Sequence, residues 1–94
     1  MTNMASSEHI EILRIGVEAI DAWHDSHPFE NLDLEAADLR GLALPGSNLN
    51  SANLSQAILD EVDLQSCDLV DAFLSHASMK LANLHTAALG STCP

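Results

Sequence analysis

The chain has 94 residues, of which 47% are apolar but only three are aromatic, so one domain with a core of small and medium side chains is expected. Its 14 acidic residues against 3 Lys and Arg give a formal net charge of −11, which disfavours direct contact with nucleic acid and with anionic membranes. Two cysteines provide no dense disulfide framework, and neither a signal peptide nor a membrane span is evident, so we expect a cytoplasmic protein.

An N-terminal helix is predicted over residues 8–26. Acidic residues favour its amino end, where the helix dipole is positive, and His27-Pro28 ends it because the residue before Pro avoids helical geometry. The apolar arc of this helix is wider than a helix on a surface needs, so we expect it to touch more than one neighbour. The arc consists of Ile10, Ile12, Leu13, Ile15, Val17, Ala19, Ile20, Ala22 and Trp23.

From residue 32 onward the sequence repeats every five residues. Eleven of the twelve positions that start at Leu34 and step by five are Leu, and the exception is Met79. The position two places earlier is Ala seven times, and the position just before the central residue is Asp or Asn seven times. The central positions are Leu34, Leu39, Leu44, Leu49, Leu54, Leu59, Leu64, Leu69, Leu74, Met79, Leu84 and Leu89.

A period of five fits neither a helix nor a flat strand. Five residues rotate an α-helix by about 140° beyond a full turn, and odd spacing places successive side chains on opposite faces of a strand. A chain that bends once per repeat resolves both conflicts, because each repeat then forms one side and points its Leu inward. Asp or Asn beside each bend favours local hydrogen bonds from side chain to backbone.

This A-(D/N)-L-x-x pattern resembles the pentapeptide-repeat family, and the resemblance covers about two thirds of the chain. It implies a β-solenoid, a right-handed quadrilateral parallel β-helix of about three coils, in which the Leu and the small residue of each repeat face inward. The stretch from Gly16 to Trp23 also resembles the leader helix of some bacterial, notably cyanobacterial, members. The apolar residues that the resemblance places outward are Ile58, Val70, Phe73 and Leu81.

We therefore expect an N-terminal capping helix and linker in residues 1–31, the β-helix in residues 32–91 and a tail in residues 92–94. Capping is expected because the first coil leaves a hydrophobic end and unpaired strand groups. Arg40, Asp60 and Lys80 fall in one column of stacked coils, where their alternating charges are expected to pair and to fix the register. At an exposed site each such pair contributes at most about 1 kcal/mol.

No residue pattern points to catalysis, a cofactor or a metal. His24 and His27 have helical spacing, but the second lies at the terminating Pro and no third ligand is evident. Cys67 occupies an inward place and is expected to be a buried, inert thiol, whereas Cys93 is expected to be exposed. The carboxylates lie on a convex surface without a cleft, and the glycines form no phosphate-binding loop, so we expect no enzyme.

The C-terminal end is the predicted interaction surface. After Leu89 only five small or polar residues remain, too few to cover a square face lined by large apolar side chains. A bare solenoid end is adhesive, and two-fold pairing of like ends closes without growing into a fibre. We expect a homodimer through this end, unless the natural chain continues and covers it. The predicted surface consists of Phe73, Met79, Leu81, Leu84 and Leu89.

Two functions stay open, with a small enzyme as the least favoured third. The first is a non-catalytic scaffold that acts as a protein–protein interaction module toward an unidentified protein. The alternative is an acidic DNA mimic that modulates DNA gyrase or another DNA-binding enzyme, as some family members do. Coils stack about 4.8 Å apart, so about three of them span only about 14 Å, which is short for such a mimic.

Overall fold

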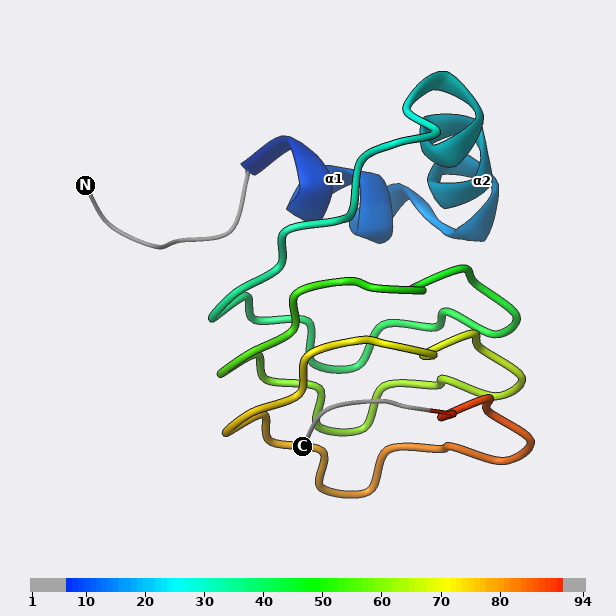
Figure 1. Cartoon of the computed structure of the whole chain (residues 1–94). Helices are drawn as coiled ribbons and strands as arrows, with labels where there is room; N and C mark the ends of the chain where they lie inside the picture. The colour runs from blue at the N-terminus through cyan, green and yellow to red at the C-terminus, as the bar shows by residue number, and fades with distance from the viewer. Residues whose placement is uncertain (1–6, 91–94) are drawn as a thin grey trace.

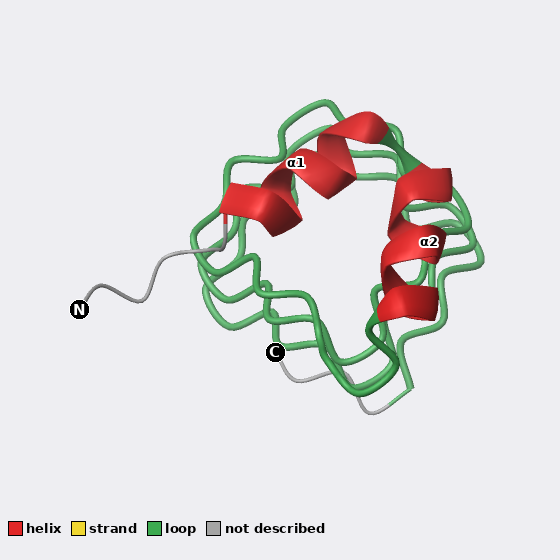
Figure 2. Cartoon of the chain, turned by 90° about the horizontal axis from the view of Figure 1, so that it is seen from above, coloured by secondary structure: helices red, strands yellow, loops and turns green. Residues whose placement is uncertain are grey.

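The computed structural model describes residues 7–90 of the chain. Two helices, α1 (Ser7–Ile15) and α2 (Val17–Ser26), come first, and the chain then winds in a regular coil beneath them (Figure 1). Seen from above, the winding is a ring, and the two helices follow part of its outline (Figure 2). Within residues 7–90, no helix is long and apolar enough to cross a membrane.

Parallel bridges join neighbouring circuits of the coil between residues that are twenty positions apart. The bridges form four series: Asp33–Asn53–Phe73, Asp38–Ile58–Ser78, Ala43–Asp63–Asn83 and Asn48–Asp68–Ala88. One series runs along each side, so one circuit has four sides of five residues, and the predicted four-sided solenoid is confirmed. We call residues 32–51 the first coil, residues 52–71 the second coil and residues 72–90 the C-terminal coil.

Each side ends in a tight turn that begins at the central residue of the repeat. In the second coil, for example, the Ala57 amide donates to the Leu54 carbonyl at 3.0 Å. The second turn residue has a φ of 59–62° at nine positions that are not glycine, among them Gln56 and Leu81. Because two of every five residues lie in a turn, each side retains isolated bridges, and the described residues contain no extended strand.

Asp and Asn fix the entrance to these turns, as the repeat predicts. Each of the seven such residues that precede a central residue accepts a hydrogen bond through its side-chain oxygen. The donor is the backbone amide two places further on, which belongs to the first turn residue. These acceptors are Asp33, Asp38, Asn48, Asn53, Asp63, Asp68 and Asn83, with donor–acceptor distances of 3.0–3.4 Å. A contact of this kind favours the turn over other local conformations.

The central leucines and the small residues between them fill the interior of the coil. The central residues of the first and second coils are at most 1% exposed, which confirms their inward orientation. Ser47 is buried among them, and its hydroxyl donates to the Leu44 carbonyl at 2.7 Å. Cys67 lies beside Ser47 and donates its thiol to the same carbonyl at 2.8 Å, so it is buried as predicted. Cys93 lies outside the described residues.

The expectation of one continuous helix over residues 8–26 is wrong, because Gly16 divides it. Gly16 has a φ of 135°, a conformation that L side chains rarely adopt, and it precedes the first residue of α2. The break turns the chain, so that α1 and α2 run along different parts of the ring outline (Figure 2). A straight helix of this length would leave the edge of the coil.

The two helices bury three large side chains against the first coil: Leu13, Ile20 and Trp23 are at most 6% exposed and belong to the same core as the leucines. Ile10 and Ile12 of the wide apolar arc also pack against this core. Ile15, at 75%, and Ala22 are the exposed members of the arc.

Three polar side chains on the helices bond the upper edge of the first coil. His9 accepts from the Asp33 amide at 2.9 Å, Arg14 donates to the Asp38 carbonyl at 3.3 Å, and a His24 ring nitrogen lies 2.9 Å from the Asn48 carbonyl oxygen. The two residues of each pair are 24 positions apart in the sequence, so the helical segment follows the first coil in constant register.

Truncating a core leucine tests the inward assignment. Leu64 lies in the second coil and is fully buried, so Leu64→Ala is expected to lower the free energy of unfolding by about 2–5 kcal/mol. Gln65→Ala, at the exposed neighbouring position, is the matched control and is expected to change it by less than about 0.5 kcal/mol. Urea denaturation of the two variants measures the difference. Equal effects would show that the Leu column does not form the core.

Candidate interaction surface at the C-terminal coil

The C-terminal coil exposes side chains that are buried in the coil above it. The central residues Leu54, Leu59, Leu64 and Leu69 of the second coil are fully buried. Their counterparts Leu74, Met79 and Leu84 are only partly buried against the core, and Leu89 is 44% exposed. The difference arises because each coil is covered by the next one, and no described residue lies below the C-terminal coil.

Backbone groups show the same discontinuity. In the second coil seven amides donate to carbonyls of the C-terminal coil at 2.7–2.9 Å: those of Leu54, Gln56, Leu59, Glu61, Leu64, Ser66 and Leu69. The C-terminal amides equivalent to the first six have no acceptor within residues 7–90: those of Leu74, His76, Met79, Leu81, Leu84 and Thr86. This end therefore presents a row of free donors beside a partly exposed apolar face.

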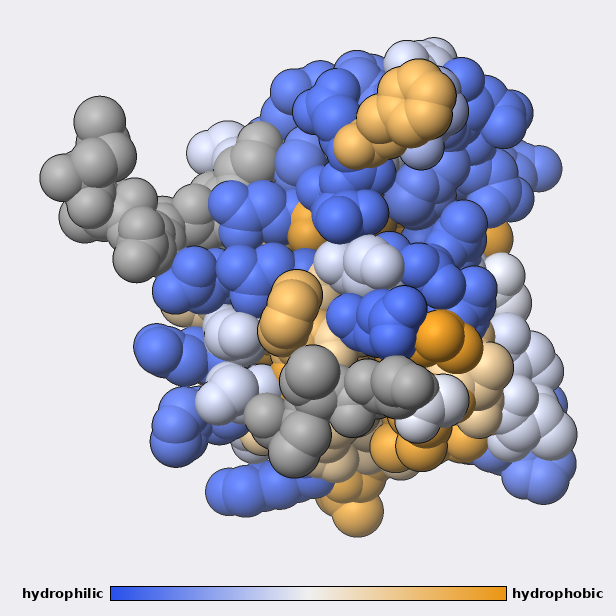
Figure 3. Space-filling model, in the orientation of Figure 1, coloured by the Kyte–Doolittle hydropathy of each residue, from blue (hydrophilic) through white to orange (hydrophobic). Residues whose placement is uncertain are grey.

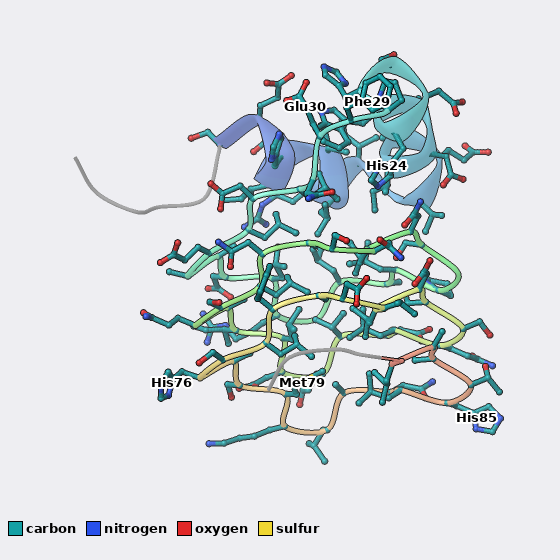
Figure 4. The ribbon with its side chains drawn as sticks, viewed as in Figure 1. His24, Phe29, Glu30, His76, Met79 and His85 are labelled. Carbon is teal, nitrogen blue, oxygen red and sulfur yellow. The ribbon has the colours of Figure 1, made fainter. Side chains whose placement is uncertain are left out.

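The five residues predicted to form the surface occupy two kinds of place. Met79, Leu84 and Leu89 belong to the inward column and line the end face itself. Phe73 is 49% exposed at a bridge position on one side, and Leu81 is 83% exposed at a turn. Figure 4 shows Met79 at the lower end of the molecule, with His76 and His85 at opposite margins. The last two residues lie beside the predicted set, and sequence reasoning did not include them.

The charge of the molecule is distributed unevenly along the axis of the coil. All 14 Asp and Glu residues lie within residues 1–71, and the C-terminal coil contains none. Of the three Lys and Arg residues of the chain, the C-terminal coil contains Lys80 alone. Figure 3 shows the consequence: hydrophilic surface covers most of the helical end, and hydrophobic surface gathers at the opposite end. Two copies of this acidic chain therefore repel each other least through their C-terminal coils.

Asp60 bonds the second coil to the C-terminal coil, but not through the predicted column of charges. Among the described residues the only salt bridge joins Arg40 to Asp38 at 2.7 Å, within one side of the first coil. Asp60 instead accepts from the Ser78 hydroxyl at 2.6 Å and from the Lys80 amide at 3.0 Å. Arg40 pairs with Asp38 and not with Asp60 as expected, because pairing with a carboxylate two residues away orders the Arg side chain at a smaller entropic cost.

These contacts also shift acid ionisation. The hydrogen bonds from the Ser78 hydroxyl and the Lys80 amide, with the charges of Lys80 and Arg40, hold the pKa of the Asp60 carboxyl below its usual value. The hydrogen bond from the Arg40 guanidinium has the same effect on the pKa of Asp38.

The helical end contains a polar groove of about 260 Å³ between α2, the linker after it and one side of the coil. Figure 4 shows His24 and Glu30 at this end. The Asn50 side-chain amide there lies 3.4 Å from the Asp68 carboxylate. The groove is lined by His24, Pro28, Glu30, Asn31, Asn48, Asn50 and Asp68. Within residues 7–90 no three His, Cys, Asp or Glu side chains are arranged to hold a metal ion.

Comparison with known proteins agrees with the repeat. A family model described as pentapeptide repeats matches residues 29–65 and 57–92, with eight copies of the repeat. A search of curated proteins found no match.

Two solved structures that match are pentapeptide repeat proteins, each 24% identical to this chain. One, from the thylakoid lumen of Arabidopsis thaliana, has a TM-score of 0.38, and the match covers 64% of this chain and 46% of that one. The other, from the cyanobacterium Cyanothece 51142, has a TM-score of 0.23, with 68% and 60% covered. This chain thus spans about half the length of the first.

The contribution of Asp60 is expected to depend on pH. Its folded pKa is lowered, so the stabilisation is complete above the unfolded value of about 4 and is lost as the pH falls through the folded value. The stability difference between the native chain and Asp60→Asn should therefore be larger at pH 7 than at pH 3, as measured by urea denaturation. Asp71→Asn is the control, because it changes the net charge by the same amount but removes an exposed carboxylate that has no hydrogen bond among the described residues. A pH-independent difference for Asp60→Asn would contradict the assignment.

Proposed function

Because this chain belongs to the pentapeptide-repeat family, whose fold is the right-handed quadrilateral β-helix, we propose that it is a non-catalytic protein–protein interaction module. In this proposal residues 32–91 form three coils, α1 and α2 cap the first one, and the C-terminal coil is the association surface. Proteins of this family are in general structural repeat proteins without catalytic activity, and the proposal extends that property to this chain.

The contacts of the helices support the capping role. An uncovered first coil would leave edge amides and carbonyls without partners, and His9, Arg14 and His24 bond three of those groups. Leu13, Ile20 and Trp23 cover the apolar interior at the same end. One end of the solenoid is thereby closed within the chain, which leaves the other end for a partner.

The single observation that carries the proposal is the row of free backbone amides on the C-terminal coil. The equivalent amides of the second coil donate to carbonyls of the C-terminal coil. A partner that supplies carbonyls at the open edge would therefore extend the same pattern of hydrogen bonds. The partly exposed Met79 and Leu84 would be buried by the same contact. A partner at this end therefore gains hydrogen bonds and apolar burial together.

We propose that the partner is a second copy of the chain. A two-fold axis perpendicular to the coil axis brings like ends together and reverses the direction of the facing coil, so the edges meet in antiparallel orientation. The same edge carries the Ala72 carbonyl, whose counterpart on Ala52 accepts from the Phe73 amide at 2.9 Å, so each copy supplies acceptors as well as donors. Such pairing is closed and does not propagate. The absence of acidic residues from the C-terminal coil favours this arrangement over contact between the acidic helical ends.

The alternative of a DNA mimic has less support. The chain measures 29 × 29 × 25 Å, so it is compact rather than rod-shaped. Its acidic residues lie on the helices, on the linker and, taking the first two coils together, on all four sides, and they are missing from residues 72–94. A DNA surface instead carries one charge per roughly 1.7 Å along its whole length. A gyrase supercoiling assay with the pure protein tests this alternative independently of the dimer.

The proposed dimer is tested by sedimentation at micromolar concentration. The native chain is expected to be a dimer, and Met79→Asp is expected to be a monomer because a carboxylate cannot be buried in that interface without a partner. Gln65→Asp adds the same charge at an exposed place on the second coil and should remain a dimer.

A native chain that is strictly monomeric would refute the proposal. A dimer that survives Met79→Asp but dissociates with Ile15→Asp would refute it equally, because the interface would then lie at the helical end. Circular dichroism of both variants shows whether the coil is intact.

A further inference from the structure

Three histidines surround the only tryptophan of the chain at the junction of the helices and the coil. The ring centroid of Trp23 lies 4.8 Å from that of His9, 5.1 Å from that of His24 and 4.7 Å from that of His27. The His27 ring is stacked on the indole at an interplanar angle of 16°, and the other two meet it edge-on. Trp23 itself is 6% exposed, so this cluster forms part of the contact between the helices and the first coil.

The three histidines differ in the hydrogen bonds that they make. His9 accepts through Nδ1 from the Asp33 amide at 2.9 Å, and a backbone amide can only donate, so this nitrogen must carry a lone pair. His24 and His27 each place a ring nitrogen 2.9 Å from a backbone carbonyl oxygen, those of Asn48 and Trp23, to which the nitrogen must donate. Protonation of the imidazole is therefore compatible with the bonds of His24 and His27 but not with that of His9.

We propose that His9 makes the docking of α1 on the first coil sensitive to pH. When the imidazole takes up a proton at Nδ1, two N–H donors face each other across 2.9 Å, and the bond to the Asp33 amide is lost. The open state of this contact can hold the proton without that loss, so protonation of the ring favours the open state.

The charged groups near His9 cannot replace the acceptor that the Asp33 amide loses. On α1 the residues one turn along, Ile12 and Leu13, are uncharged, and Glu8 is its sequence neighbour. From α2 it meets Trp23, on which the rings of His24 and His27 also pack. From the coil it meets Asp33, whose carboxylate accepts from the Glu35 amide at 3.4 Å. The carboxylates of Glu8 and Asp33 attract an imidazolium, which promotes protonation but does not supply an acceptor for the amide.

Two other effects of acid act in the opposite direction and must be separated experimentally. An imidazolium stacked on Trp23 at the place of His27 gains cation–π attraction. Acidification also reduces the repulsion within a chain of net charge −11. Comparison of the native chain with a variant at His9 alone cancels both effects, because all other groups titrate alike in the two proteins.

His9→Asn is the decisive variant, since its side-chain oxygen can take the place of Nδ1 as acceptor but does not titrate. Thermal unfolding followed by the fluorescence of Trp23 reports directly on this junction. Between about pH 7.5 and about pH 5, the melting temperature of the native chain should fall by roughly 4–8 °C relative to that of His9→Asn, the shift expected for one hydrogen bond in a domain of this size. His85→Gln removes an exposed histidine far from the cluster and should behave like the native chain.

An equal pH response of the native chain and His9→Asn would overturn the proposal. If the variant is destabilised already at neutral pH, the native chain decides the question by the nitrogen chemical shifts of its imidazoles. They should show His9 with an unprotonated Nδ1 at pH 7.5, and the amide of Asp33 should shift as His9 titrates. A proton on Nδ1 of His9 at pH 7.5 would rule the proposal out.

Discussion

The bonds between backbone groups twenty residues apart are the constraint on which the whole structure depends. Each coil donates from its amides to carbonyls of both neighbouring coils, as Leu54 does to Phe73 below it and Asn53 does to Leu32 above it. This stacking places each central Leu of the first two coils above the central residue of the next coil, which is Leu except at Met79, and it excludes water from the interior. Since the pattern has no internal end, each terminus of the solenoid leaves polar backbone groups and apolar side chains that need a cover.

The two ends of the chain meet that need in different ways. At the amino end, α1 and α2 combine buried apolar residues such as Trp23 with polar side chains that bond the coil edge. One of these bonds is donated by the Asp33 amide to Nδ1 of His9, which can accept it only while that nitrogen is unprotonated. At the carboxyl end, the described residues leave the edge open and free of acidic groups. The strong negative charge elsewhere limits random association, so the open end is the surface best suited to one specific contact.

Much of this fold could be predicted from the sequence because the repeat encodes it directly. The period of five and the Leu column identified the interior, and Cys67 was placed correctly because it occupies the small position of the repeat. The Asp and Asn positions identified the turns for a similar reason, since their side chains bond locally.

Other features depend on geometry that composition does not reveal. The positive φ at residues such as Leu81 is imposed by closure of the square rather than by local preference, because glycine occupies few of these places. The break at Gly16 could not be predicted from the helical pattern, because it depends on the helices following the outline of the ring beneath them. The pairing of Arg40 with Asp38 was missed because stacking was considered before nearer partners. The candidate surface was predicted as a set of side chains, whereas its backbone donors became apparent only when the coils could be compared.

Amide hydrogen exchange measured as a function of protein concentration tests the central claim most directly. The amides of Leu54, Leu59 and Leu64 are bonded within the chain, so they should be protected at every concentration. The amides of Leu74, Met79 and Leu84 should exchange rapidly in dilute solution and become protected at concentrations where two copies associate. Rapid exchange of the second group at all concentrations would contradict the account, and so would protection of that group in a dilute monomer.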